Sequence, residues 1–284
     1  MIVTPPLAPE PIRFEVLLSQ SWTLFRRNWI VALPPVIAML IGLLGAGAWI
    51  AFVATAALSR RGLDHASDGF VGGVVVTWIV FIPVMLVVGL WSFAAMYGMA
   101  DAAWSRGTAT FADGFAAFRT RSGALIVAFI GLVGVAIAAL ILTLPTLGLA
   151  LLALPLVTMY VAPAVVSGGR GGFNAIGESF RLVRRFFGPS AIALLVLVGI
   201  QYGASFLSTL AILPLEFAVM PGPGQTAPHA PPLGLALASG LVFVLAVLAG
   251  QAYTGYYAIA IVGLYRSLCA QPTGPQPPGR IVPV

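Results

Sequence analysis

The sequence predicts an all-α integral membrane helical bundle of about six transmembrane helices, and three observations lead to this fold class. Hydrophobic residues make up 60% of the 284 residues and charged residues only 8%. The mean hydropathy is +1.03. The apolar residues gather in six long stretches that carry almost no charge. A soluble protein of this length needs a more polar surface than this composition supplies.

Each apolar stretch is long enough to cross a bilayer as a helix, because a hydrocarbon core of about 30 Å takes about 20 residues. A helix also satisfies its own backbone hydrogen bonds in lipid. The first, second and sixth stretches exceed this length, so we expect them to tilt, to bend or to extend beyond the bilayer. The stretches are residues 29–58, 71–100, 124–144, 147–166, 191–213 and 233–264.

Prolines mark two places where these helices are expected to deviate. The pair Pro34-Pro35 predicts a bend in the first stretch, because proline removes a helical hydrogen bond. Pro155 and Pro163 lie inside the fourth stretch. A re-entrant segment is therefore the alternative to a full span there, although it would carry the arginines that follow to the opposite side.

The arginines predict the orientation. If the N-terminus is cytoplasmic, twelve of the 14 basic residues, all of them arginine, lie on the inner side and only Arg60 and Arg61 lie outside. Basic residues concentrate in cytoplasmic loops. The absence of lysine beside abundant Ala, Gly, Arg and Pro is typical of GC-rich bacteria. We therefore expect a multi-pass protein of the bacterial cytoplasmic membrane with both termini in the cytoplasm.

An internal repeat organises the chain. Residues 20–29, before the first span, align without a gap with residues 178–187, before the fifth, as [QE]-S-aromatic-x-L-apolar-R-R-x-aromatic. A weaker copy, residues 116–121, precedes the third span. Apolar residues recur every three or four positions, which predicts amphipathic helices. These stripes are Leu18, Trp22, Phe25 and Trp29 in the first copy, and Ile176, Phe180, Val183 and Phe187 in the other.

We therefore expect three units, each an interfacial amphipathic helix followed by a transmembrane hairpin. They form one polytopic domain over residues 12–270, with units at about 12–100, 108–167 and 172–265. Residues 1–11 and 271–284 are expected to be disordered tails, since they are rich in proline and lack periodicity. The second helices of the units carry similar pairs, Met96-Tyr97, Met159-Tyr160 and Tyr256-Tyr257, whose tyrosines would suit the membrane interface.

The basic residues of the repeats are the candidate contacts to anionic lipid. The net charge is +6 and the isoelectric point is near 10.1. Because the charge lies beside the spans, lipid headgroups are a simpler partner than nucleic acid, and a membrane-protein partner is also possible. The side chains expected to reach phosphates are Arg26, Arg27, Arg119, Arg121, Arg181, Arg184 and Arg185.

Polar side chains at membrane depth form a second candidate site. Gln201 and Gln251 lie near the middle of the fifth and sixth spans, so they could meet. One interpretation is an interhelical hydrogen bond. The alternative is a crevice for a lipid or small molecule, lined by Gln201, Tyr202, Gln251, Tyr253 and Thr254.

The sequence offers no set of catalytic groups. It contains none of the motifs G-x-x-x-x-G-K-[ST], G-x-S-x-G or H-E-x-x-H. Asp64, His65 and Asp68 could offer metal ligands, but we interpret them as ordinary loop polarity. The glycine-rich segment 167–172 is either a hinge or a phosphate-binding loop. We predict no enzyme activity, no cofactor and no metal site.

The chain resembles a bacterial family, the membrane domain associated with glycerophosphoryl diester phosphodiesterases. The resemblance rests on S-[WF]-x-L-x-R-R before an apolar span and on the run from Ala162 to Val166 followed by Gly168 and Gly169. It covers roughly residues 12 to 265. In some members a phosphodiesterase barrel follows the membrane domain. This sequence has no such barrel, so the resemblance implies the membrane fold and no catalysis.

Two functions remain as hypotheses. The first is a non-catalytic membrane protein whose basic amphipathic helices bind anionic lipid and organise lipid or partner proteins. The second is a transporter or facilitator for a lipid or small amphiphile, which would use the polar crevice. The absence of ionisable residues near the middle of the spans argues against proton coupling.

Overall fold

The computed structural model describes residues 13–59, 67–219 and 233–270, and every regular element within them is helical. This confirms the predicted all-α class for the described chain. The elements are α1 (Phe14–Arg27), the short 3₁₀ helix η1 (Trp29–Ala32), α2 (Leu33–Ser59), α3 (Ser67–Arg106), α4 (Phe111–Thr143), α5 (Leu149–Thr158), α6 (Val161–Val166), α7 (Gly172–Arg185), α8 (Phe187–Val219) and α9 (Leu233–Ala270). Both predicted tails lie outside the described residues.

Five helical segments of the described chain are long and apolar enough to cross a membrane. A sixth is obtained if α7 and the first part of α8, which meet at 103°, are counted as one bent span. This number agrees with the expected six and indicates a multi-pass membrane protein. The five segments are Trp29–Ala51, Ile79–Arg106, Phe111–Thr143, Leu149–Val166 and Leu237–Ala270.

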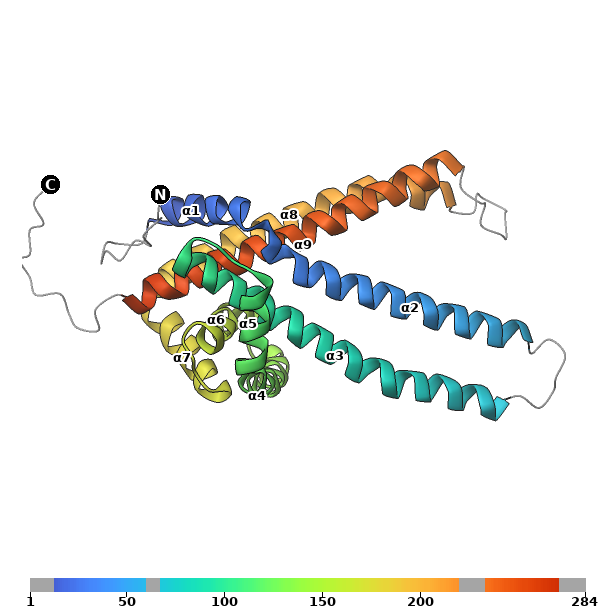
Figure 1. Cartoon of the computed structure of the whole chain (residues 1–284), viewed down its shortest axis with the longest axis horizontal. Helices are drawn as coiled ribbons and strands as arrows, with labels where there is room; N and C mark the ends of the chain where they lie inside the picture. The colour runs from blue at the N-terminus through green and yellow to red at the C-terminus, as the bar shows by residue number, and fades with distance from the viewer. Residues whose placement is uncertain (1–12, 60–66, 220–232, 271–284) are drawn as a thin grey trace, which may run out of the picture.

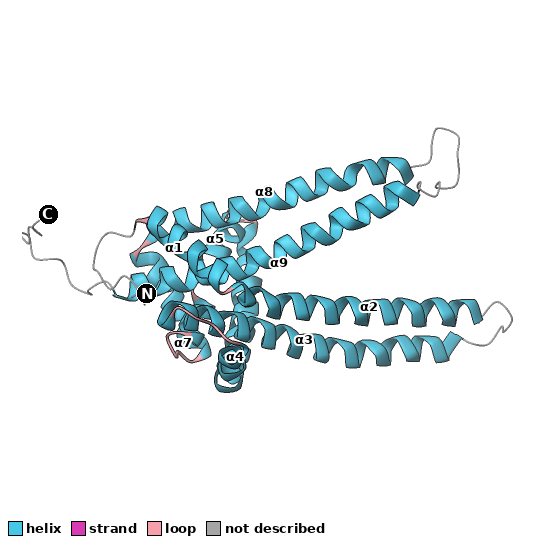
Figure 2. Ribbon diagram, turned by 45° about the horizontal axis from the view of Figure 1, so that its top comes forward, coloured by secondary structure: helices cyan, strands magenta, loops and turns pink. Residues whose placement is uncertain are grey.

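The long helices form hairpins that diverge from one end of the molecule. In Figure 1, α2 runs beside α3 and α8 runs beside α9, and the two pairs separate with distance from the cluster that contains α1 and α4–α7. Figure 2 shows the same divergence after a 45° turn. Helix α4 is seen nearly along its axis in Figure 1, so it runs in a different direction from both hairpins. The spans are therefore not a parallel bundle along their full length.

The core lies at this shared end, which we call the hub. It consists of residues 94–104 of α3, 159–165 at α6 and 258–268 of α9, and most of these residues are less than 9% exposed. The far halves of the same helices differ: Ile79 and Leu237 are 64% and 66% exposed. An apolar surface of this extent on the hairpins is the kind that lipid covers. Helices α3 and α9 thus each have a buried half at the hub and an exposed apolar half that would face lipid.

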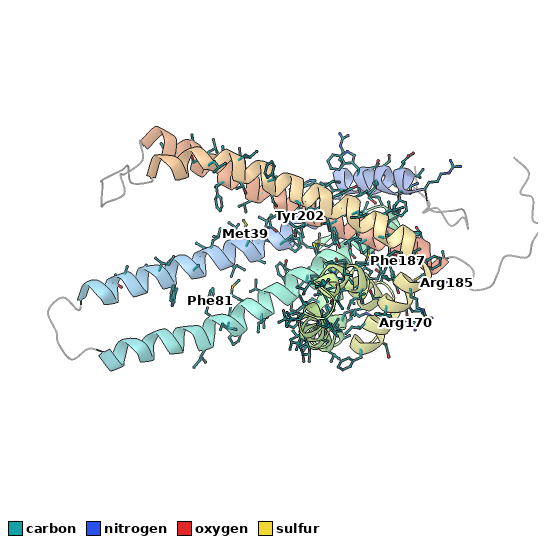
Figure 3. The ribbon with its side chains drawn as sticks, turned by 180° about the vertical axis from the view of Figure 1, so that it is seen from behind. Met39, Phe81, Arg170, Arg185, Phe187 and Tyr202 are labelled. Atoms are coloured by element: carbon teal, nitrogen blue, oxygen red, sulfur yellow. The ribbon has the colours of Figure 1, made fainter. Side chains whose placement is uncertain are left out.

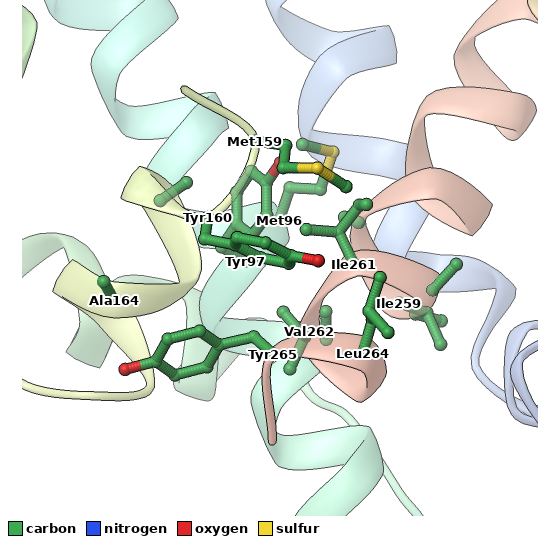
Figure 4. Packing of buried hydrophobic residues seen from close by; sticks show 14 of the residues in the cluster. Met96, Tyr97, Met159, Tyr160, Ala164, Ile259, Ile261, Val262, Leu264 and Tyr265 are labelled. Atoms are coloured by element: carbon green, nitrogen blue, oxygen red, sulfur yellow. The ribbon is translucent and has the colours of Figure 1, made fainter. Parts of the chain in front are cut away.

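The tyrosines expected at the membrane interface lie in the hub instead. Tyr97 is 4% exposed and Tyr160 is fully buried, and Tyr257 packs against the same cluster. Figure 4 shows Tyr97 and Tyr160 among Met96, Met159 and the residues of α9. The Tyr160 hydroxyl shares a 2.9 Å hydrogen bond with a serine of α8, which satisfies its polar atom inside the core. The interface prediction was therefore wrong for these side chains.

The expected bend at Pro34-Pro35 is also absent. Both prolines occupy the first turn of α2, where an amide has no intrahelical partner, so they begin the helix without breaking it. The break comes just before, at η1. Between α4 and α5 the chain reverses through residues 144–148, with Leu147 and Gly148 at φ of 51° and 89°. This turn is longer than the two residues that separate the predicted third and fourth stretches.

Helix α4 joins the weakest repeat copy to its span. It continues from Phe111 to Thr143 without interruption, so residues 116–121 are its first turns and not a separate helix. The helix begins where the Asp113 carboxylate accepts hydrogen bonds from the Thr110 amide and hydroxyl, at 2.9 and 2.8 Å. This is the side-chain arrangement that starts a helix efficiently. The other two copies, α1 and α7, are separate helices.

Candidate functional site

Helices α1 and α7 end in the same way. Their terminal residues Asn28 and Phe186 have φ and ψ of −124° and 43°, and of −122° and 48°. Each amide donates back four residues, to Leu24 at 2.9 Å and to Leu182 at 2.8 Å. The chain then turns sharply into an apolar helix. The repeated sequence therefore produces the same local backbone twice.

The two helices also bury equivalent positions. Ser21 and Ser179 are fully buried, and Leu24 and Leu182 are each 5% exposed. Several aromatic residues of the stripes identified in the sequence lie farther out, and Trp22 is 52% exposed, whereas Val183 of the second stripe is only 6% exposed. The equivalent residues are exposed to a similar extent: 58% for Trp29, 57% for Phe180 and 62% for Phe187. The packed face thus consists of smaller residues, which a hydropathy pattern weighs less than aromatic ones.

The arginine pairs lie at the exposed ends of these helices. Arg26, Arg27 and Arg184 are exposed, and among the described residues they form no ion pair. The Arg185 guanidinium lies 4.9 Å from the centre of the Phe186 ring. Figure 3 shows Arg185 and Phe187 close to the hub end of α8. The Phe186 ring is itself half-buried, whereas Phe187 beside it is exposed.

Arg181 has a different environment, which the sequence did not indicate. It lies 3.4 Å from the carboxylate of Glu178, whose side chain is only 8% exposed. Arg170 contacts the same carboxylate at 2.7 Å, and the Tyr265 hydroxyl donates to it at 3.4 Å. Glu178 therefore links the glycine-rich segment and α9 to α7. Its position in the repeat is taken by Gln20 in α1, so the charge belongs to one copy only.

The glycine-rich segment packs tightly against its neighbours. A Cβ atom at Gly168 would lie 2.2 Å from the Tyr265 hydroxyl oxygen, and one at Gly172 would lie 2.5 Å from the Ala128 amide nitrogen. Gly169 has φ of +65°, which favours glycine. These contacts account for three glycines by close packing and turn geometry.

A second group of charges lies where α3 meets α4 and α9. Arg266 donates two hydrogen bonds to Oδ1 of Asp101, at 2.7 and 3.0 Å, and one to the Ser105 hydroxyl at 2.7 Å. Arg106 pairs with Asp113 at 2.6 Å. Both aspartates are thus matched by an arginine.

Asp101, Arg106 and Asp113 of this group border a cleft of about 300 Å³ between α3, α4 and the end of α6. Its polar lining consists of Asp101, Ser105, Arg106, Asp113, Thr120 and Arg121. Of the two predicted lipid-contacting arginines of α4, Arg121 is half-buried on this cleft and Arg119 points to the exposed side. The sequence singled out both arginines but could not distinguish them, because the cleft depends on the crossing of α3 and α4.

The predicted polar crevice is only partly assembled. Gln251 lies against α2, with its amide nitrogen 3.9 Å from Met39 Sδ, and not against Gln201. Gln201 and Tyr202 are exposed on α8, as Figure 3 shows for Tyr202. The Tyr253 hydroxyl donates to the Leu197 carbonyl of α8. Thr254 bonds within its own helix, to the Gly250 carbonyl at 2.9 Å.

The described residues contain no group of three His, Cys, Asp or Glu side chains that could hold a metal ion. Of the three loop residues considered as metal ligands, Asp64 and His65 lie outside the described residues, and Asp68 lies in the first turn of α3. No family model matches the chain, and no curated protein or solved structure matches it either. The resemblance to the membrane domain of the phosphodiesterase family therefore stays a prediction.

Proposed function

We propose that this chain is a non-catalytic protein of the bacterial cytoplasmic membrane whose basic amphipathic helices bind anionic lipid headgroups and organise lipid or partner proteins. The observation that supports this most is the matched end of α1 and α7. In both helices an exposed arginine pair adjoins an exposed aromatic side chain, immediately before a sharp turn into an apolar helix. That turn would bring the arginines to the headgroup layer when the apolar helix enters lipid.

We include in this proposal the threefold arrangement and the orientation with both termini inside. Helix α1 packs on α9, the start of α4 packs on α3, and α7 packs on α6. The first segment of each unit thus contacts the last helix of another unit, and the three last helices contact one another in the hub. These contacts support a closed ring of three units. The described chain also begins and ends at the hub side, which supports termini on one side of the membrane.

Arginine doublets provide a charge-matched test. The variants Arg26→Gln/Arg27→Gln and Arg184→Gln/Arg185→Gln each remove two charges, and the control Arg60→Gln/Arg61→Gln removes two from the opposite predicted side. A basic residue near an anionic surface contributes about 1 kcal/mol. Each inner doublet should therefore weaken association with spin-labelled phosphatidylglycerol by up to about 30-fold relative to phosphatidylcholine.

The control doublet should change this ratio much less, since cytoplasmic-side helices carry the proposed contacts. Equal lipid selectivity in the wild type and in both inner doublets would refute the proposed headgroup binding. A facilitator function has less support, because the polar crevice that it would use is only partly assembled: Gln251 lies against Met39, and Gln201 is exposed on α8. We therefore do not propose transport.

A further inference from the structure

We infer that the cleft between α3 and α4 is a binding site for a phosphate group, with the Arg121 guanidinium as its principal ligand. This site is separate from the arginine doublets of α1 and α7 and does not depend on their contact with lipid. Its volume of about 300 Å³ is at the lower end of the range for small-molecule sites. It therefore suits a headgroup or a small phosphate compound and not a whole lipid.

The charges around the cleft leave one arginine unmatched. Two arginines, Arg106 and Arg121, line the cleft together with two aspartates. A third arginine, Arg266, reaches one of these aspartates, Asp101, from α9. Arg106 and Arg266 each hold one carboxylate. Arg121 has no ion pair or hydrogen bond among the described residues, although it is half-buried. A partly desolvated cation without a partner favours an anionic ligand.

The structure also holds Arg121 in a defined position. A Cβ atom at Gly169 would lie 3.2 Å from its Nη2 and 3.5 Å from its Nη1, so the guanidinium packs against the glycine backbone. Gly169 tolerates this approach because it has no side chain, and its φ of +65° disfavours any replacement. A planar guanidinium fixed in this way presents two parallel N–H donors, which is the arrangement that binds phosphate bidentately.

Small residues create the space in front of Arg121. A Cβ atom at Gly98 would lie 2.3 Å from the Ala117 Cβ, so α3 and α4 nearly touch below the cleft. Ala102, Ala116 and Ala117 then line its walls without filling it. The acidic groups do not repel an anion strongly, because the Asp113 oxygens are occupied by Arg106 and Thr110. One oxygen of Asp101, Oδ2, remains available to a donor on the same ligand.

Calorimetric titration of the full chain in detergent micelles tests the site. One arm uses inorganic phosphate, and the other uses dihexanoyl-phosphatidylglycerol below its micelle concentration. For whichever probe binds the wild type, Arg121→Gln should raise the dissociation constant by about tenfold or more, because it removes charged hydrogen bonds. The control Arg119→Gln removes the same charge two residues away, on the exposed side and outside the cleft lining, and should leave the binding of inorganic phosphate unchanged.

The results of the two arms show whether the phosphate belongs to a lipid headgroup or to a soluble compound, or show that the site does not bind phosphate. Binding of the short-chain lipid alone supports a headgroup, and binding of inorganic phosphate as well supports a soluble phosphate compound. No binding in either arm, or equal losses in Arg119→Gln and Arg121→Gln, overturns the inference. If Arg121→Gln does not fold, Arg121→Lys replaces it, because it keeps the charge but loses the fork and should still weaken binding severalfold. Unchanged binding in that variant also overturns the inference.

The inner doublet variants separate this result from the proposed function. Because their arginines do not line the cleft, they should bind inorganic phosphate as the wild type does, and Arg121→Gln should still weaken binding of the short-chain lipid in their background. If Arg121→Gln has no effect on probe binding but the doublets reduce lipid selectivity, the cleft proposal is wrong. If the doublets have no effect on lipid selectivity but Arg121→Gln weakens probe binding, the proposed function is wrong.

Discussion

Replacing Asn28 by alanine should destabilise the hub strongly, although the residue contributes little apolar surface. The side chain is 3% exposed and lies at the break between α1 and η1. Its amide nitrogen donates to the Leu24 and Gly107 carbonyls at 2.9 and 3.2 Å, and its oxygen accepts from the Ala109 amide at 2.7 Å. Asn28 thus joins the end of α1 to the turn between α3 and α4.

The size of the effect follows from these three hydrogen bonds. A net contribution of about 0.5–1.5 kcal/mol each gives about 1.5–4.5 kcal/mol. The lower average of about 0.6 kcal/mol found for side-chain bonds within membranes still gives about 2 kcal/mol. The Gly107 carbonyl and Ala109 amide would also lose partners in a buried position, which adds to the cost. We expect a loss of about 2–4 kcal/mol in the free energy of unfolding.

Unfolding by sodium dodecyl sulfate in mixed micelles, followed by tryptophan fluorescence, measures this loss. The control is Asn174→Ala, an exposed asparagine on α7, which should change stability by less than about 0.5 kcal/mol. Asn28→Asp keeps the acceptor for Ala109 but turns a second acceptor toward two carbonyls, so it should also destabilise. If both Asn28 variants unfold like the wild type, the hydrogen-bond reasoning is wrong.

Three further predictions follow from the packing. Gly172→Ala should lower the free energy of unfolding by about 1–3 kcal/mol, because the added Cβ would lie 2.5 Å from the α4 backbone. The control Gly177→Ala has open space around it and should be neutral or stabilising by up to about 1 kcal/mol. Glu178→Gln should cost about 1–3 kcal/mol in the same unfolding assay, since it removes the charge that holds Arg170 and Arg181. Gln251→Leu should change stability by less than about 1 kcal/mol, because its described contact is a long one to a methionine sulfur.

Each of these has a clear contrary result. Equal stability of the two glycine variants would show that α7 does not approach α4 as closely as the 2.5 Å contact requires. A Glu178→Gln variant as stable as the wild type would mean that the ion pairs with Arg170 and Arg181 contribute no more stability than hydration of the same arginines by water. A loss above about 2 kcal/mol in Gln251→Leu would point to a stronger polar partner than Met39.

Composition and periodicity were sufficient to predict the helical fold class, because a lipid bilayer allows only a few kinds of backbone structure. A chain with this many long apolar stretches must satisfy its backbone internally, and helices do so. The repeat was also accurate at the local level: Ser21 with Ser179, and Leu24 with Leu182, occupy equivalent buried positions. The segment of the weaker copy differs, because it continues without a break into α4.

Position along the chain was insufficient to distinguish residues of the same kind. Tyrosines near helix ends are common at membrane interfaces, but α3 and α9 are longer than a bilayer requires, so Tyr97 lies in a packed hub beyond the lipid-facing half. The glutamines of α8 and α9 share a depth, yet Gln251 faces α2 and Gln201 is exposed. The direction of a side chain around a helix depends on which neighbour packs there.

The sequence by itself determined the solvent, the helical class and the repeated basic segments, because hydropathy and local periodicity are properties of neighbouring residues. Tertiary structure alone decided that Glu178 contacts Arg170, Arg181 and Tyr265. It also decided that Arg121 lies beside a cleft without a polar partner in the described part of the chain, while Arg119 is exposed. These relations join residues far apart in the chain. They depend on how closely helices approach, which small residues such as Gly98 permit without any pattern that hydropathy records.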